Sequence, residues 1–179
     1  MVPSDSAQAP PRHPLVLLAR QAVETYVRFG RIIDVPQPLP PELSQPGAVF
    51  VCLKIGGVLR GCVGTIEPRS LSIAHETIAN AIAAAVNDPR FFPVSVAELP
   101  SLTYTIDLLH PPEPVNSIEE LDPVRFGVIV SSGARRGLLL PALEGIADAA
   151  MQVLLAAQKA GIRPGEPVTL QRFAVERLT

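Results

Sequence analysis

The feature that most constrains the fold is an apolar run followed by two adjacent glycines. Residues 48–54 read AVFVCLK, a nearly continuous apolar stretch of strand length, which indicates burial on both faces. Gly56 and Gly57 favour a two-residue turn between antiparallel strands. Residues 58–66 then return as the partner strand. The sequence therefore predicts a β-hairpin over residues 48–66.

The returning strand carries the motif LRGCVGT at residues 59–65. Alternate residues of a strand share a face, so Arg60 and Cys62 lie on the same side, and Gly61 and Gly64 add no side chain to cover them. A nearby guanidinium favours the thiolate, which is the reactive form of cysteine. Two interpretations are open: a reactive Cys62 in a cleft with Arg60, or a packed cysteine beside a surface arginine.

The expected hairpin register separates the two cysteines of the chain. A regular turn at the glycines pairs Ile55 with Val58 and places Cys52 opposite Gly61. Cys52 and Cys62 then point to opposite faces of the sheet, and we expect no disulfide between them. A slip of one residue in the register would reverse this expectation.

Composition limits the possible classes of protein. The chain has 179 residues, 47% of them hydrophobic and 18% charged, which is typical of one globular domain with or without a small subdomain. A net charge of −2 gives no overall basic field for nucleic acid. No apolar run is long enough to span a membrane. Residues 1–5 lack a leader pattern, so a reducing cytoplasm is expected.

Periodicity predicts three helices and several further strands. Residues 1–13 are expected to be a disordered tail and residues 14–179 the folded domain. Locally joined strand pairs with helices between them indicate an α+β fold with a mixed, mostly antiparallel sheet flanked by helices. The expected helices are 15–29, 71–86 and 142–159, and the further expected strands are 102–109, 126–130, 135–140 and 168–175. Capping-box spacing at residues 95–98 and 117–120 predicts short helical turns.

Polar residues after the motif are weaker candidates for chemistry. A regular strand puts Thr65 and Glu67 on the face opposite Cys62, whereas a bulge at Gly64 would bring Glu67 round as a general base. His75, on the helix that follows, either pairs with Cys62 as a catalytic dyad or belongs to an ordinary amphipathic face.

Asp88 and Arg90 flank the predicted end of the second helix. They either bind a ligand or hold main-chain groups of the helix end. No spacing of Cys, His or carboxylate residues matches a metal site, so no metal or cofactor is expected.

Several of these blocks, in this order, resemble the AMMECR1 domain family. The matching blocks are 50–54, 59–65, 88–91, 98–99, 127–130, 137–141 and 159–161. The resemblance covers about residues 14–178 and implies the family's α+β fold. It also implies association with MEMO-like and radical-SAM proteins and a link to RNA modification.

Two hypotheses about function follow, one for a binding domain and one for an enzyme. The first is a domain that binds a small molecule or a partner in a cleft around residues 59–65. The second is a thiol-dependent enzyme that uses Cys62 and acts on RNA or a small molecule. The predicted catalytic residues are Cys62 and, more weakly, Glu67. The predicted ligand-binding residues are Arg60, Gly61, Gly64, Thr65, Asp88 and Arg90.

Overall fold

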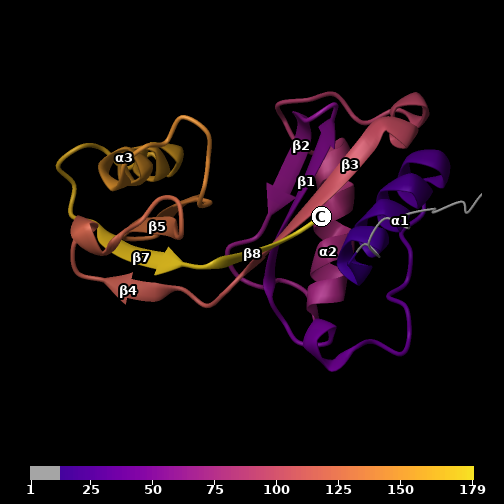
Figure 1. Cartoon of the computed structure of the whole chain (residues 1–179), viewed down its shortest axis with the longest axis horizontal. Coiled ribbons are helices and arrows are strands. Elements are labelled where there is room, and N and C mark those ends of the chain that lie inside the picture. Colours follow the sequence, from indigo (N-terminus) through magenta and orange to yellow (C-terminus); the bar gives the residue numbers. More distant parts are fainter. Residues whose placement is uncertain (1–12) are drawn as a thin grey trace, which may run out of the picture.

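The computed structural model describes residues 13–179, so the tail predicted over residues 1–13 lies outside the described residues except at His13. The described chain forms two lobes side by side, each built on its own sheet (Figure 1). The larger lobe contains both ends of the described chain, and the smaller lobe is formed by the segment between them.

The larger lobe is a four-stranded sheet in the order β2-β1-β3-β8, with two helices on one face (Figure 1). Its strands are β1 (Ala48–Ile55), β2 (Val58–Gly64), β3 (Leu102–Leu109) and β8 (Val175–Leu178), and its helices are α1 (Pro14–Phe29) and α2 (Ile73–Val86). Val49, Val51 and Leu53 of the central strand β1 are fully buried with the helices. The other face of β1 presents Phe50, Cys52 and Lys54.

Local sequence signals explain where these elements begin and end. Proline lies in the first turn of α1, and Gly30, with a φ of 65°, ends it in the left-handed conformation. The Ser72 side chain caps α2 by accepting the His75 N–H. The shorter 3-10 helices of this lobe are η1 (Pro41–Leu43) and η2 (Val96–Ser101), and η2 carries the predicted capping box of Ser95 and Glu98.

The smaller lobe is a second four-stranded sheet in the order β4-β7-β5-β6. Its strands are β4 (Glu113–Val115), β5 (Gly127–Ser132), β6 (Arg135–Leu139) and β7 (Thr169–Phe173), and its helices are η3 (Ile118–Glu120) and α3 (Ala149–Lys159). Helix α3 packs on β5 and β6, where Val128, Val130 and Ala156 form a buried core. The capping box predicted at Ser117 and Glu120 is present at η3.

A third apolar cluster joins the lobes. Ile129 and Phe173, on the face of the second sheet away from α3, pack with Phe50 of β1. Glycine makes room for both aromatic rings, because a Cβ at Gly64 would lie 2.1 Å from the Phe50 ring and one at Gly127 would lie 2.1 Å from the Phe173 ring. The packing of the Phe50 and Phe173 rings at the contact between the lobes therefore requires glycine at positions 64 and 127.

The predicted α+β fold, with mostly antiparallel strands flanked by helices, is confirmed. The strands form two sheets in which every described pair is antiparallel, rather than one mixed sheet. Within residues 13–179, no helix has both the length and the apolar character needed to cross a bilayer.

The helix predicted over residues 142–159 is wrong in its first half. Residues 142–148 are irregular, with positive φ at Ala142 and Gly145, and α3 starts only where the Asp148 side chain accepts the Met151 N–H. Helix α2 also starts later than predicted, at Ile73, and Leu71 is 81% exposed rather than on the buried stripe.

Candidate functional site

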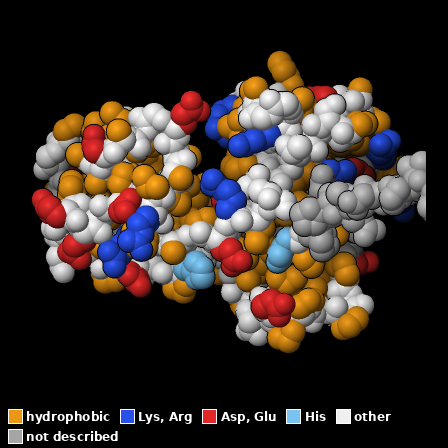
Figure 2. Space-filling view, in the orientation of Figure 1, with side chains coloured by type: hydrophobic (Ala, Val, Ile, Leu, Met, Phe, Trp, Pro, Cys, Tyr) orange, Lys and Arg blue, Asp and Glu red, His pale blue; other side chains and the backbone are white. Residues whose placement is uncertain are grey.

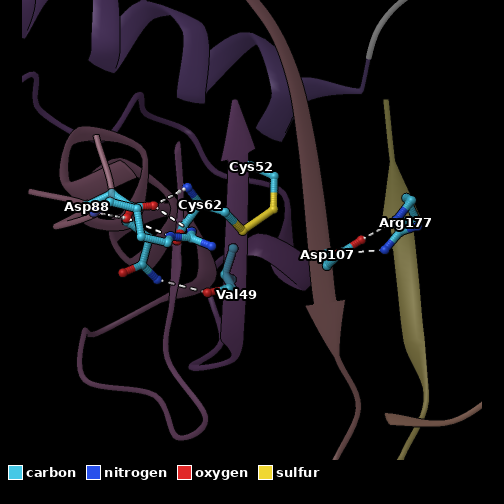
Figure 3. Close-up of a disulfide and its surroundings, with 8 residues drawn as sticks. Val49, Cys52, Cys62, Asp88, Asp107 and Arg177 are labelled. Carbon is cyan, nitrogen blue, oxygen red and sulfur yellow. Dashed lines mark hydrogen bonds and ion pairs between the residues drawn. A yellow bond between two sulfur atoms is a disulfide. The ribbon is translucent and has the colours of Figure 1, made fainter. Parts of the chain in front are cut away.

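The β1–β2 hairpin contains a bulge that changes its register. Leu53 pairs with Gly61 while Lys54 pairs with Leu59, so Arg60 is an extra residue in β2. Beyond this point Cys52 lies directly opposite Cys62, with the two Cα atoms 4.1 Å apart. The two cysteines form a disulfide (Figure 3). The predictions that they face opposite sides of the sheet and remain unbonded are therefore wrong.

The main chain of Cys62 is held by the loop that follows α2. The carboxylate of Asp88 accepts the Cys62 N–H at 2.9 Å, and Nη2 of Arg90 donates to the Cys62 carbonyl at 3.3 Å. Asp88 also accepts Nε and Nη2 of Arg90 at 2.9 and 2.7 Å. Figure 3 shows Asp88 at the main chain of Cys62, beside the disulfide. Asp88 and Arg90, predicted either to bind a ligand or to hold main-chain groups at the helix end, thus lie directly at Cys62.

The charge of Asp88 is strongly stabilised. Its side chain is buried, whereas that of Arg90 is 55% exposed. Hydrogen bonds from the Arg90 side chain and from the main chain at Cys62 and Arg90 outweigh the effect of burial, so the pKa of Asp88 lies far below its usual range. The carboxylate is therefore ionised and fixes the position of the guanidinium.

Arg60 has a different environment from the one predicted. Its Nε and Nη2 donate to the Glu98 carboxylate at 2.6 and 3.2 Å, and its Nη1 donates to the Phe92 carbonyl at 3.0 Å. This pairing with Arg60, together with hydrogen bonds from Ser95, lowers the pKa of Glu98 to about 2. Both Arg60 and Arg90 lie near the Phe91 ring. Arg60 therefore anchors the loop after α2 to the hairpin.

The glycines of the motif serve close packing. A Cβ at Gly61 would lie 2.1 Å from the main-chain oxygen of Ala84 in α2. Gly64 lies under the Phe50 ring, as described above. The hypothesis that these glycines leave the cysteine uncovered has no support in this geometry, because Gly61 faces the helix layer and Gly64 is covered by a ring.

Thr65 and Glu67 are also engaged elsewhere. The Thr65 hydroxyl donates to the buried carboxylate of Glu76 at 2.5 Å. Burial acts to raise the pKa of Glu76, but hydrogen bonds from Thr65 and from residues 69–70 outweigh it and lower the pKa. Glu67 is exposed and forms an ion pair with Arg136 of the smaller lobe. The alternative of a bulge at Gly64 is not seen, because Gly64 pairs regularly with Phe50 and the register shift lies at Arg60.

His75 does not form the alternative dyad with Cys62. Its ring nitrogen Nδ1 lies 2.8 Å from the Ser72 hydroxyl at the start of α2. It lines an apolar hollow of about 520 Å³ together with Ile33 and Ile78. A second hollow, of about 450 Å³, lies at the start of β1 near His110. Both hollows are lined by residues other than the cysteines.

A lysine from the smaller lobe approaches this region. Lys159, the last residue of α3, donates from Nζ to the Leu138 carbonyl at 3.1 Å. Partial desolvation, and then the positive charge of Arg90, lower the pKa of Lys159. Lys159 thus adds a cation from the smaller lobe, and Figure 2 shows both basic and acidic side chains near the place where the lobes meet.

Sequence reasoning missed three members of this region. The sequence predicts Cys52 on the face opposite Cys62 and Glu98 in a capping box. Lys159 enters only through a block of the family resemblance. Contacts between residues so far apart in the sequence leave no local sequence pattern, because they depend on how the folded segments pack together. Among the described residues, no group of three or more His, Cys, Asp or Glu side chains is placed to hold a metal ion.

The arrangement defines a two-lobed α+β protein in which the half-exposed Arg90, paired with Asp88, lies beside a half-buried disulfide. Comparison with family models matches AMMECR1 over residues 16–178, and the chain belongs to this family. The resemblance predicted from the motif blocks is confirmed. The association with MEMO-like and radical-SAM proteins and the link to RNA stay predictions.

Two relatives and one solved structure show the extent of the similarity. A protein of Thermotoga maritima is 47% identical over 168 residues, covering 92% of this chain and 97% of its own length. A Clostridium acetobutylicum protein is 43% identical, but this chain spans only 36% of its length. The crystal structure of the uncharacterized protein PH0010 from Pyrococcus horikoshii superposes with a TM-score of 0.85 at 35% identity, covering 91% of this chain and 88% of that one.

Proposed function

We propose that this chain is a binding domain whose ligand presents a carboxylate or phosphate group to the junction of the lobes, next to the motif of residues 59–65. The observation that carries the proposal is the half-exposed guanidinium of Arg90, which Asp88 holds against the Cys62 carbonyl. A guanidinium fixed in this way is suited to binding a carboxylate or phosphate group. The charge of Arg90 also contributes to the lowered pKa of Lys159, so the smaller lobe adds a second cation to this region.

Both cations keep donors for such a ligand. Arg90 uses Nε and Nη2 for Asp88 and Cys62, and its Nη1 has no hydrogen-bond partner within residues 13–179. Lys159 uses one of its three N–H donors on the Leu138 carbonyl. Asp88 offsets one positive charge, which leaves one net positive charge at the site. An anion of low charge fits this balance.

The experiment is a titration of the 15N-labelled protein, followed by NMR at constant ionic strength. Inorganic phosphate and succinate serve as separate probes of the phosphate and carboxylate alternatives. We expect shifts of the amides of Cys62, Arg90 and Lys159, and at least roughly tenfold weaker binding in Arg90→Gln and Lys159→Gln. Lys54→Gln, which changes the other lysine at the exposed hairpin end, is the matched control and should bind normally.

Shifts confined to other surfaces, or equal binding by Lys159→Gln and Lys54→Gln, would contradict the proposal. A thiol-dependent enzyme that uses Cys62 is the second candidate function. It requires reduction of Cys62, because both cysteines of the chain are in the disulfide. The half-buried position of that disulfide beside Arg90 is the observation in its favour.

A further inference from the structure

We propose that the Cys52–Cys62 disulfide is a thiol–disulfide exchange site whose substrates are small thiols that carry an acidic group. The inference rests on the proposed anion site for its substrate class. The exchange chemistry itself rests on the position of the two cysteines in the hairpin.

The disulfide lies outside the apolar core. Cys52 and Cys62 are half-buried, whereas their neighbours Val51 and Leu53 on the opposite face of β1 are fully buried. Neither sulfur belongs to the buried clusters of the described chain. A small thiol therefore does not have to open the core to reach this bond.

The hairpin does not depend on the disulfide for its structure. β1 lies between β2 and β3 and is paired with both along its length. Asp88 holds the Cys62 main chain, and the Asn80 side chain donates to the Val49 carbonyl at 2.9 Å. The cysteines are only ten positions apart in sequence, so the bond closes a short loop that the strand pairing already closes. Reduction should leave the strands in place.

The exchange balances as follows. The thiolate of the substrate attacks Sγ of Cys52, the S–S bond breaks, and Cys62 leaves as a thiolate. A second substrate thiolate attacks the substrate-derived sulfur of this mixed disulfide. The bond to Cys52 breaks, Cys52 leaves as a thiolate, and a small-molecule disulfide forms. The protons of the two substrate thiols end on Cys52 and Cys62. The substrate is oxidised by two electrons and the protein disulfide is reduced, and a disulfide of the same class reverses the reaction.

Positive charge near Cys62 favours thiols that carry an acidic group, and it favours Cys62 as the sulfur that leaves. The Arg90 guanidinium contacts the Cys62 carbonyl, and a cation near a departing thiolate stabilises it. Within residues 13–179, the hydrogen bonds of Arg90 to Asp88 and Cys62 leave its Nη1 unpaired, so Arg90 attracts an acidic group on the incoming thiol, and Lys159 of the smaller lobe adds to this positive field. Asp88 opposes this field, but its two oxygens are already paired with Arg90.

The test measures exchange in the native, oxidised, full-length protein. Three probes differ in charge: 3-mercaptopropionate, 2-mercaptoethanol and cysteamine. Samples are quenched with acid, and new thiols are alkylated and counted by mass spectrometry. Circular dichroism follows the fold. Each rate is divided by the rate of the same thiol with a small uncharged disulfide, which removes differences in intrinsic nucleophilicity.

We expect complete, reversible appearance of two thiols without loss of helix signal. The normalised rate should be on the order of tenfold higher for the anionic than for the cationic thiol. This preference should fall in Arg90→Gln and Lys159→Gln. It should persist in Arg31→Gln, which removes an exposed cation just after α1, on the helix side of the larger sheet.

Exchange that occurs only after the protein unfolds would overturn the exchange proposal. The NMR titration with phosphate and succinate shows separately whether the proposed anion-binding function stands. Exchange without any preference for acidic thiols would overturn the assigned substrate class. Loss of the helix signal on reduction would show that the bond is a structural crosslink.

Discussion

Asp88 accepts the main-chain N–H of Cys62 at 2.9 Å, and this hydrogen bond joins the loop after α2 to the middle of β2. The same carboxylate holds Arg90. One buried side chain therefore fixes both a strand and a half-exposed guanidinium. Substitutions at Asp88 should affect stability and ligand binding together.

Asp88→Asn should destabilise the protein by about 2 kcal/mol, because charge-assisted hydrogen bonds are replaced by neutral ones. The half-exposed Arg90 is partly screened by water, which limits the loss. Urea unfolding of the variant and the wild type at pH 7 measures the difference. A change within error would show that the Asp88 carboxylate does not stabilise the fold.

Glu98 should make stability depend on acid pH. Its pKa is about 2 in the folded protein against a usual value of 4.5, so its contribution is complete above pH 4.5 and is lost as the pH falls towards 2. The stability difference between wild type and Glu98→Gln should therefore shrink over this range. Urea titrations at several pH values measure it, and a difference that is independent of pH would contradict the role of the Arg60 pair.

Gly61→Ala should destabilise the protein by about 2–3 kcal/mol, since its Cβ would meet the main-chain oxygen of Ala84 and the strand or the helix must move. Gly30→Ala is the control, because it has a positive φ but open space around it. Its cost should be only about 1 kcal/mol. Equal losses in denaturant unfolding would argue against close packing at position 61.

Thiol counting tests the disulfide directly. Unreduced protein in denaturant should show no free thiol, and reduced protein should show two, matching the two cysteines of the chain. Reduction should cost about 2–3 kcal/mol in the loop-entropy picture, which a typical folded domain tolerates. Two free thiols before reduction would instead restore the expectation drawn from a regular hairpin.

The hairpin itself was predictable because its signals are local. The apolar run of β1 and the turn glycines Gly56 and Gly57 specify two adjacent strands. The bulge at Arg60 was not predictable, since the same residues fit a regular strand. The bulged Arg60 is paired with Glu98, which is 38 positions away, and no local pattern indicates that partner. One extra residue in β2 then brought Cys62 opposite Cys52.

The remaining errors have the same physical origin. Apolar residues recur at helical spacing between residues 142 and 159, but positive φ values at Ala142 and Gly145 exclude a continuous helix. The candidate site was predicted only on the side of the larger lobe, at Arg90 and its neighbours. Lys159 comes from another sheet-and-helix unit, and no sequence periodicity indicates how two such units pack.

The order of strands in the larger lobe has a consequence for how the lobes are joined. Leu109 at the end of β3 pairs with Val175 at the start of β8. The chain therefore enters the smaller lobe and returns from it at two directly paired residues of the larger sheet. The smaller lobe is therefore an insertion between two neighbouring strands of the larger sheet, and its two covalent connections lie side by side. Its orientation is set in addition by the packing of Phe50 and by the ion pair between Arg136 and Glu67.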